Sequence, residues 1–137
     1  MHELAVAQSI LDIAIAKARA EGATRIRSIR ITIGVLTTYM DESLRFYWDS
    51  ITEGTLAEGS TIEFTRVGGR LVCLRCGAEY ATDRPEFQCP KCGSLWTRPL
   101  SGNECFVDSI DIDDSIDIDD SIEIGTAEIE KEEAVCR

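Results

Sequence analysis

The chain has 137 residues, 44% hydrophobic and 28% charged, which is typical of one soluble domain or of a small domain that carries an inserted module. No apolar run approaches the roughly 18 residues that a transmembrane helix needs, and the N-terminus lacks the basic segment of a secretory signal. We therefore expect a cytoplasmic protein, in which paired cysteines indicate zinc more often than disulfides.

The net charge of −11 is concentrated at the C-terminal end. Residues 108–137 contain 12 acidic and 2 basic residues, whereas residues 1–107 contain 13 acidic and 12 basic residues. A nearly neutral body lacks the basic excess that binding to nucleic-acid phosphates requires. The charge distribution therefore argues against a nucleic-acid-binding protein, although small zinc modules often serve that function.

Helical and strand-like periodicities alternate along the first half of the chain. The patterns predict a helix, a strand, a second helix and a second strand at residues 4–20, 26–33, 41–54 and 60–67. Residues 104–112 alternate again and predict a last strand, which we expect to return to the first sheet. The fold class predicted is α+β, a small mixed β-sheet with two helices.

A different composition interrupts this pattern after Gly68–Gly69. Cysteines and turn residues dominate up to about Pro99, with few large aliphatic residues. We therefore expect a discontinuous α+β domain at residues 1–68 and 102–113, with an inserted zinc-ribbon-like domain at residues 69–101.

The acidic end of the chain is repetitive. The hexapeptide Asp108–Asp113 recurs as Asp114–Asp119 and, in altered form, as Asp120–Gly125. Three repeats are few for a solenoid. Because the charge is so dense, residues 114–137 are predicted to be a flexible or edge-associated acidic tail, with weak attraction of cations as a functional alternative to no specific role.

Two Cys-x-x-Cys pairs carry the strongest single motif, at Cys73, Cys76, Cys89 and Cys92. Four thiolates satisfy a tetrahedral zinc ion and leave no position open for substrate, so a structural Zn²⁺ site is predicted. A redox dithiol pair and an iron–sulfur centre are alternatives without supporting sequence around them. Of the remaining cysteines, Cys105 is expected to be a small buried residue. Cys136 is expected to be an exposed thiol.

His2, the only histidine, follows the first residue. The Met1 amine, the His2 backbone nitrogen and the His2 imidazole make a compact chelate, to which Glu3 can add its amide or carboxylate. Such nitrogen-rich coordination suits Ni(II) or Cu(II) better than Zn(II). Taken alone, however, a histidine at this position is more often an ordinary surface residue.

The combination of motifs closely resembles the HypA/HybF family of nickel metallochaperones for [NiFe]-hydrogenase maturation. The resemblance covers about residues 1–112 and rests on Met1-His2-Glu3-Leu4, Ile31-Thr-Ile-Gly34, Cys73-x-x-Cys76, Cys89-Pro-x-Cys92-Gly93-Ser94, Gly102-x-Glu104 and Val107-x-Ser109-Ile110. The acidic repeat beyond Asp113 lies outside the family pattern.

The resemblance implies a non-enzymatic nickel carrier. It implies a Ni²⁺ site at Met1, His2 and Glu3, and a structural zinc on the four paired cysteines. The implied partners are the HypB-type nickel GTPase, the [NiFe]-hydrogenase large-subunit precursor and, for some members, urease maturation proteins, with the chain a monomer or homodimer. A zinc-ribbon interaction adaptor without a nickel site is the alternative.

Overall fold

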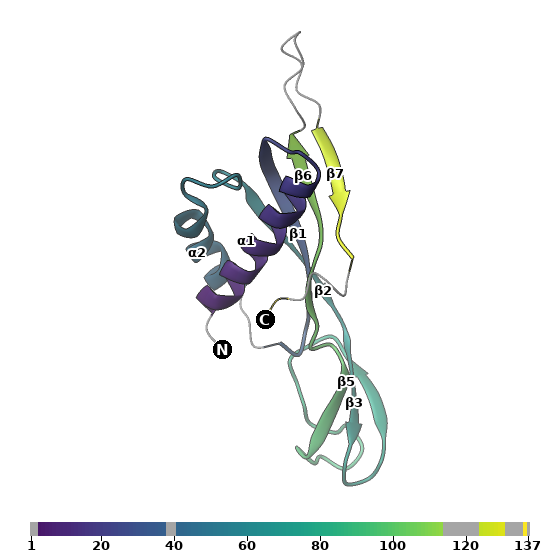
Figure 1. Ribbon diagram of the computed structural model, residues 1–137. Coiled ribbons are helices and arrows are strands. Elements are labelled where there is room, and N and C mark those ends of the chain that lie inside the picture. The colour runs from purple at the N-terminus through teal and green to yellow at the C-terminus, as the bar shows by residue number, and fades with distance from the viewer. Residues whose placement is uncertain (1–2, 38–40, 114–123, 131–135, 137) are drawn as a thin grey trace. The chain divides into compact units, whose positions relative to one another are not determined.

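The computed structural model describes residues 3–37, 41–113, 124–130 and 136, which form two sheets (Figure 1). The elements follow in the order α1 (Glu3–Ala20), β1 (Arg25–Gly34), α2 (Asp41–Thr52), β2 (Thr61–Val67), β3 (Gly69–Cys73), β4 (Glu79–Thr82), β5 (Thr97–Ser101), β6 (Cys105–Asp113) and β7 (Ile124–Glu128). The strand orders are β2-β1-β6-β7 and β4-β3-β5. The predicted α+β class with an inserted cysteine-rich module is confirmed.

The chain divides into two compact units. Unit 1 comprises Met1–Ile31, Tyr39–Phe64 and Phe106–Arg137, and unit 2 comprises Thr32–Thr38 and Thr65–Cys105. The domain boundaries predicted above were drawn from changes in composition, and they remain a prediction. The compact units are defined by contacts, and they group the segment Thr32–Thr38 with the cysteine-rich module.

Helix α1 matches the predicted helix at residues 4–20 and has clear end signals. Glu3 occupies its first turn and the basic Lys17 and Arg19 its last, which suits the helix dipole. At the C-terminal end, Gly22 has a φ of 71° and its N–H bonds to the Arg19 carbonyl, while the Ala23 N–H bonds to that of Ala18. This pair of bonds is a Schellman motif, which explains why the helix stops there.

Both helices lie on one side of β1, β6 and β7, and they contact each other (Figure 1). The buried stripe of α1 consists of Val6, Ala7, Ile10, Leu11, Ala14 and Ala18. On α2, Trp48 is buried, and its indole N–H donates to the Ser60 hydroxyl at 2.9 Å, so no polar group of that ring is left unpaired. Ile29 and Ile110 are fully buried on β1 and β6 and complete the core of unit 1.

A carboxylate on β6 ties three strands of unit 1 together. Asp111 accepts hydrogen bonds from Nη1 and Nη2 of Arg30, at 2.9 and 3.0 Å. Its oxygens also accept from the hydroxyls of Ser28, at 2.6 Å, and Thr126, at 2.8 Å. The hydrogen bonds from Arg30 lower the pKa of Asp111 to about 2, against desolvation, which raises it. These bonds connect β1 and β7 to β6.

Replacing Asp111 with asparagine is expected to lower the free energy of unfolding near neutral pH by about 1–2 kcal/mol. Because the pKa of Asp111 is depressed in the folded state, its stabilising effect is present above the ordinary value of 3.8 and is lost as the pH falls toward about 2. Urea unfolding of Asp111→Asn should therefore show a weaker loss of stability between about pH 4 and pH 2 than the unaltered chain. Asp49→Asn, at an exposed carboxylate on α2, is the control, and equal pH dependence in both variants would contradict this role.

Three glycines of unit 2 bring separate backbone segments into direct contact. A Cβ on Gly34 would lie 2.0 Å from the carbonyl oxygen of Gly102, and one on Gly102 would lie 2.5 Å from the Cα of Gly69. The Gly102 carbonyl accepts from the Leu36 N–H at 2.7 Å, and the Glu104 carbonyl accepts from the Gly34 N–H at 2.8 Å. We call Gly34, Gly69 and Gly102 the glycine junction; it holds the turn after β1 against both ends of the cysteine-rich module.

Candidate metal centre

The first cysteine pair forms a tight turn at the end of β3. Cys73 is the last residue of that strand, and the Gly77 N–H donates to the Cys73 carbonyl at 2.9 Å. Gly77 has a φ of 76°, which residues with a side chain rarely adopt. The Cys76 N–H points to the Cys73 sulfur, with a distance of 3.4 Å from nitrogen to sulfur. This turn directs both thiols to the same side.

The second pair repeats this geometry. The Gly93 N–H donates to the Cys89 carbonyl at 2.9 Å, and Gly93 has a φ of 73°. The Cys89 N–H donates to the Ser94 carbonyl at 2.9 Å, and the Gln88 amide donates to the Gly93 carbonyl at 3.1 Å. Both turns therefore place the glycine after the second cysteine at a positive φ, which favours glycine over residues with a side chain.

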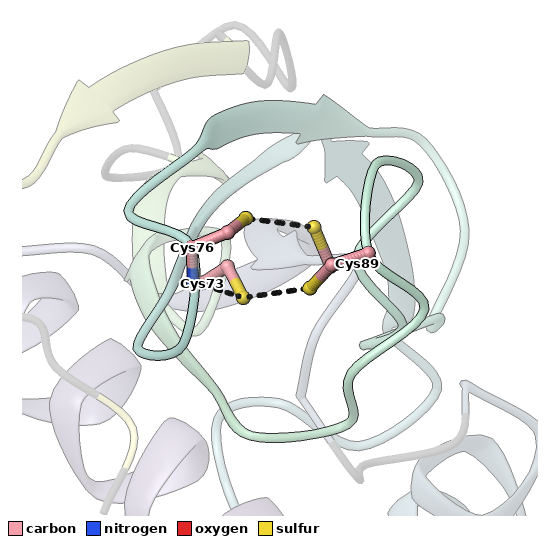
Figure 2. Close-up of side chains that lie close together, drawn as sticks. Cys73, Cys76 and Cys89 are labelled. Carbon is pink, nitrogen blue, oxygen red and sulfur yellow. Dashed lines mark hydrogen bonds between the residues drawn. The ribbon is translucent and has the colours of Figure 1, made fainter.

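The four thiols converge on one centre, and Figure 2 shows the side chains of Cys73, Cys76 and Cys89 pointing to a common point. All four sulfurs lie within 4.8 Å of one another. The distances are 3.5 Å between the sulfurs of Cys73 and Cys92 and 3.7 Å between those of Cys76 and Cys89. Zinc–sulfur bonds of about 2.3 Å in a tetrahedron place the sulfurs about 3.8 Å apart, so the group has the size of a tetrahedral tetrathiolate site.

Hydrogen bonds prepare part of this cluster for ionisation. Backbone N–H groups, chiefly that of Cys76, lower the pKa of Cys73 to about 6, and the backbone N–H of Cys92 is the main cause of a lowered pKa at Cys89. At Cys92 the Ser94 N–H acts to lower the pKa, but contacts with the other thiols and desolvation outweigh it and raise the pKa to about 11. If all four thiols ionised without a cation, the neighbouring thiolates would repel one another strongly. A bound metal ion compensates this repulsion with its positive charge.

A supporting layer of this centre was not predicted from the sequence. The carbonyl of Phe87, two residues before Cys89, accepts hydrogen bonds from the hydroxyls of Tyr80 and Thr97, both at 2.8 Å. Tyr80 lies on β4 and Thr97 on β5, so the two outer strands of the small sheet position the second cysteine turn. No local sequence signal marks such contacts, because the partners come from separate strands.

The predicted nickel residues are placed only in part. Glu3 is the first residue of α1 and is half-buried, whereas Met1 and His2 lie outside the described residues. Within the described part of the chain, the four paired cysteines are the one group of three or more potential metal-binding side chains close enough to hold an ion. The structure thus assembles one of the two predicted metal sites and leaves the other untested.

The remaining cysteines do not belong to the cluster. Cys105 is buried, as expected. The expectation of an exposed thiol at Cys136 is wrong, because Cys136 is 3% exposed, and both residues are disulfide-bonded. The polar sequence around Cys136 suggested exposure, and only the tertiary structure shows its burial.

Together, an α+β unit and an inserted β-module with a tetrathiolate cluster define a small two-part metal-binding protein. A family described as "Hydrogenase/urease nickel incorporation, metallochaperone, hypA" matches residues 1–112. A hydrogenase maturation factor HypA of Chlorobium luteolum is 42% identical over 113 residues, which are 82% of this chain and 97% of that protein. The Azotobacter vinelandii HypA is 36% identical over 82% of this chain and 100% of its own length.

A solved structure of a similar protein has the same fold as this chain. The solution structure of the Ni metallochaperone HypA from Helicobacter pylori superposes with a TM-score of 0.58 at 20% identity, over 82% of this chain and 97% of that one. The chain belongs to the HypA family, and its function is that of a nickel metallochaperone in hydrogenase maturation. The acidic extension lies beyond the matched residues.

Proposed function

We propose that the chain carries Ni(II) on Met1, His2 and Glu3, and that Cys73, Cys76, Cys89 and Cys92 hold a structural Zn²⁺. In this account the protein captures and releases nickel and catalyses no reaction. The observation that carries the proposal is the family match, which begins at residue 1 and includes the segment Met1-His2-Glu3.

The helix start supports a terminal nickel site. Backbone N–H groups in the first turn of a helix have no intrahelical acceptor. Because Glu3 is the first residue of α1, its amide nitrogen can bind a metal without loss of a helix hydrogen bond. The Glu3 carboxylate also lies where the helix dipole favours a negative charge, so it is an available oxygen ligand.

The zinc assignment is supported by the donor set and by closure of the site. Soft thiolates in a tetrahedron select zinc or iron–sulfur centres, and the cluster here has the dimensions of a single ion. Four protein ligands leave no open position, which suits a structural ion rather than the ion being delivered. The two metals therefore have separate sites and separate roles.

The proposed partners are the proteins that nickel delivery requires. A carrier needs a protein that accepts the metal, and we propose the [NiFe]-hydrogenase large-subunit precursor as the recipient, with a HypB-type GTPase as the nickel-handling partner. Urease maturation proteins are a second client class, because the matched family is described for both enzymes. We place this delivery in the cytoplasm; no described helix is long and apolar enough to cross a membrane.

A maturation assay tests the nickel function in a cell. In a host that lacks its own HypA and has a [NiFe]-hydrogenase, expression of this chain should restore hydrogenase activity. The His2→Ala variant should restore at least about tenfold less activity. A tenfold loss corresponds to about 1.4 kcal/mol of nickel-binding free energy. Gln8→Ala, on the same helix but exposed, is the control. If His2→Ala matures hydrogenase as well as the unaltered chain, the terminal site is not the functional one.

A further inference from the structure

The small sheet of unit 2 buries only one of its two faces. On its middle strand, β3, Leu71 and Cys73 are buried, whereas Arg70 is exposed and Val72 is half-buried. Successive side chains of a strand point to opposite faces, so Arg70 and Val72 lie on the face opposite to that of Cys73. This second face of the sheet is open to solvent.

The strand register places a tryptophan on this open face. Val72 lies opposite Arg98 of β5, and two residues further along β3 the Leu74 N–H donates to the Trp96 carbonyl at 2.9 Å. Because residues directly opposite each other share a face, Leu74 and Trp96 lie on the same face as Val72. We call Arg70, Val72, Leu74, Trp96 and Arg98 the open sheet face.

The apolar residues of the open sheet face are unusually accessible to water. The side chain of Trp96 is 69% exposed, whereas Trp48, the other tryptophan, is 2% exposed in unit 1. Leu74, beside Trp96, is 49% exposed. Neighbouring large apolar side chains left in water often mark binding surfaces, and tryptophan and arginine are the residues most enriched at the energetic centres of protein interfaces. The open sheet face has this composition.

The arginines of the open sheet face are not compensated by carboxylates. Among the described residues, neither Arg70 nor Arg98 has an ion-pair partner. Glu79 of β4 lies opposite Val72, so the paired strands give this face two arginines against one carboxylate. The whole chain has a net charge of −11 and repels an acidic partner elsewhere. A locally positive surface on such a chain therefore both attracts and orients an acidic partner.

The spacing of the open sheet face fits an extended segment of another chain. Residues that share a face of a strand are about 6.8 Å apart, and alternate side chains of an extended peptide have the same spacing. Apolar side chains of the segment can cover Leu74 and Trp96 while its carboxylates reach Arg70 and Arg98. We propose that the open sheet face is a docking surface for an extended, acidic and apolar segment of another protein. The proposal does not depend on the terminal nickel site.

Fluorescence anisotropy with short labelled peptides tests this surface in the zinc-loaded, full-length chain. One peptide has leucines followed by glutamates at alternate positions, separated by serines, and the other has lysines in place of the glutamates. We expect saturable binding of the glutamate peptide, at least about tenfold tighter than binding of the lysine peptide. Equal affinity for both peptides, or no binding of the glutamate peptide, would overturn the proposal.

A single-stranded oligothymidine is the third probe, because a tryptophan beside arginines can also stack on nucleic-acid bases. The net charge of −11 and the presence of Glu79 on this face oppose binding of phosphates. We therefore expect the oligothymidine to bind more weakly than the glutamate peptide. Tighter binding of the oligothymidine would replace the proposed protein segment with a nucleic acid and overturn the proposal.

Replacement of the tryptophan locates the bound peptide on the chain. Trp96→Ser should weaken binding of the glutamate peptide at least about tenfold, because it removes the largest apolar contact of the surface. Phe46→Ser is the matched control, since Phe46 is 76% exposed on α2 in unit 1, and its affinity should be unchanged. Equal affinity in Trp96→Ser and the unaltered chain would show that the peptide binds elsewhere, contrary to the proposal.

Charge reversal provides an independent test. The double variant Arg70→Glu/Arg98→Glu should bind the lysine peptide more tightly than the glutamate peptide, the reverse of the unaltered chain. Arg84→Glu, at an exposed arginine in the loop after β4, is the matched control and should keep the original preference. Equal zinc content in the variants shows that unit 2 is intact. A double variant that still prefers the glutamate peptide would contradict the proposed role of the two arginines.

Discussion

Gly102→Ala is expected to lower the free energy of unfolding by about 4 kcal/mol. Gly102 has a φ of 100°, in the region that costs a residue with a side chain about 1–2 kcal/mol. Its new Cβ would lie 2.5 Å from the Cα of Gly69, and such overpacking costs about a further 1–3 kcal/mol. Because the obstacle is backbone rather than a flexible side chain, the glycine junction cannot relax locally. Denaturant unfolding gives the measurement.

Gly22→Ala separates the two contributions to this loss. Gly22 has a φ of 71°, but a Cβ there would meet nothing within 4 Å. This control should therefore lose only the backbone contribution, about 1–2 kcal/mol. If both alanine variants lose equal stability, close packing at the glycine junction does not contribute to the stability of the fold.

Cys76→Ser is expected to abolish zinc binding and to unfold the small sheet of unit 2. Apparent binding energies of structural zinc are about 10–16 kcal/mol, and this energy is folding energy for a small module. The sheet β4-β3-β5 depends on the cluster because Cys73 ends β3 and the turn before β5 contains Cys89 and Cys92. Metal analysis should show loss of zinc. Hydrogen exchange should show loss of protection in β3–β5, while α1 stays protected.

A histidine at the same position provides the comparison. Zinc accepts a Cys₃His ligand set as well as Cys₄, and the exposed position of Cys76 gives an imidazole room. Cys76→His should therefore retain zinc and most of the protection that Cys76→Ser loses. Equal zinc content in Cys76→Ser and the unaltered chain would show that the cluster is not the zinc site.

Local hydrophobic periodicity correctly predicted the helices and strands that bury only one of their faces. The predicted helix at residues 4–20 is observed at Glu3–Ala20, and the predicted strand at residues 60–67 at Thr61–Val67, because each buries one regular stripe or ends at a turn residue. The cysteine spacing likewise predicted the cluster, since each short pair forms its turn through local hydrogen bonds. These features depend on residues close in sequence.

Features that depend on distant partners could not be predicted in this way. Strands β3, β4 and β5 are short and largely lack alternating apolar residues, so their pairing becomes visible only in the assembled sheet. The glycine junction depends on Gly34 and Gly102 meeting across 68 residues of sequence. Strand β7 lies in the segment predicted to be a flexible or edge-associated acidic tail, and it does pair at the edge of the sheet, beside β6. Its bounds and register could not be predicted, because they depend on contacts such as the hydrogen bond from Thr126 to Asp111, which joins two strands. The residues at the N-terminus offered a chelate on His2, but only the family resemblance favoured this interpretation over an ordinary surface histidine.

The terminal nickel site is tested most directly by Ni(II) titration of three zinc-loaded, untagged chains: the unaltered protein, His2→Ala, and a chain with one glycine added before Met1. The account predicts one Ni(II) per chain for the unaltered protein and, for each of the other two, affinity weaker by at least about tenfold, which corresponds to about 1.4 kcal/mol. Zinc content should be equal in all three, because the cysteines are untouched. Equal nickel stoichiometry and affinity in all three would contradict a site built on Met1, His2 and Glu3.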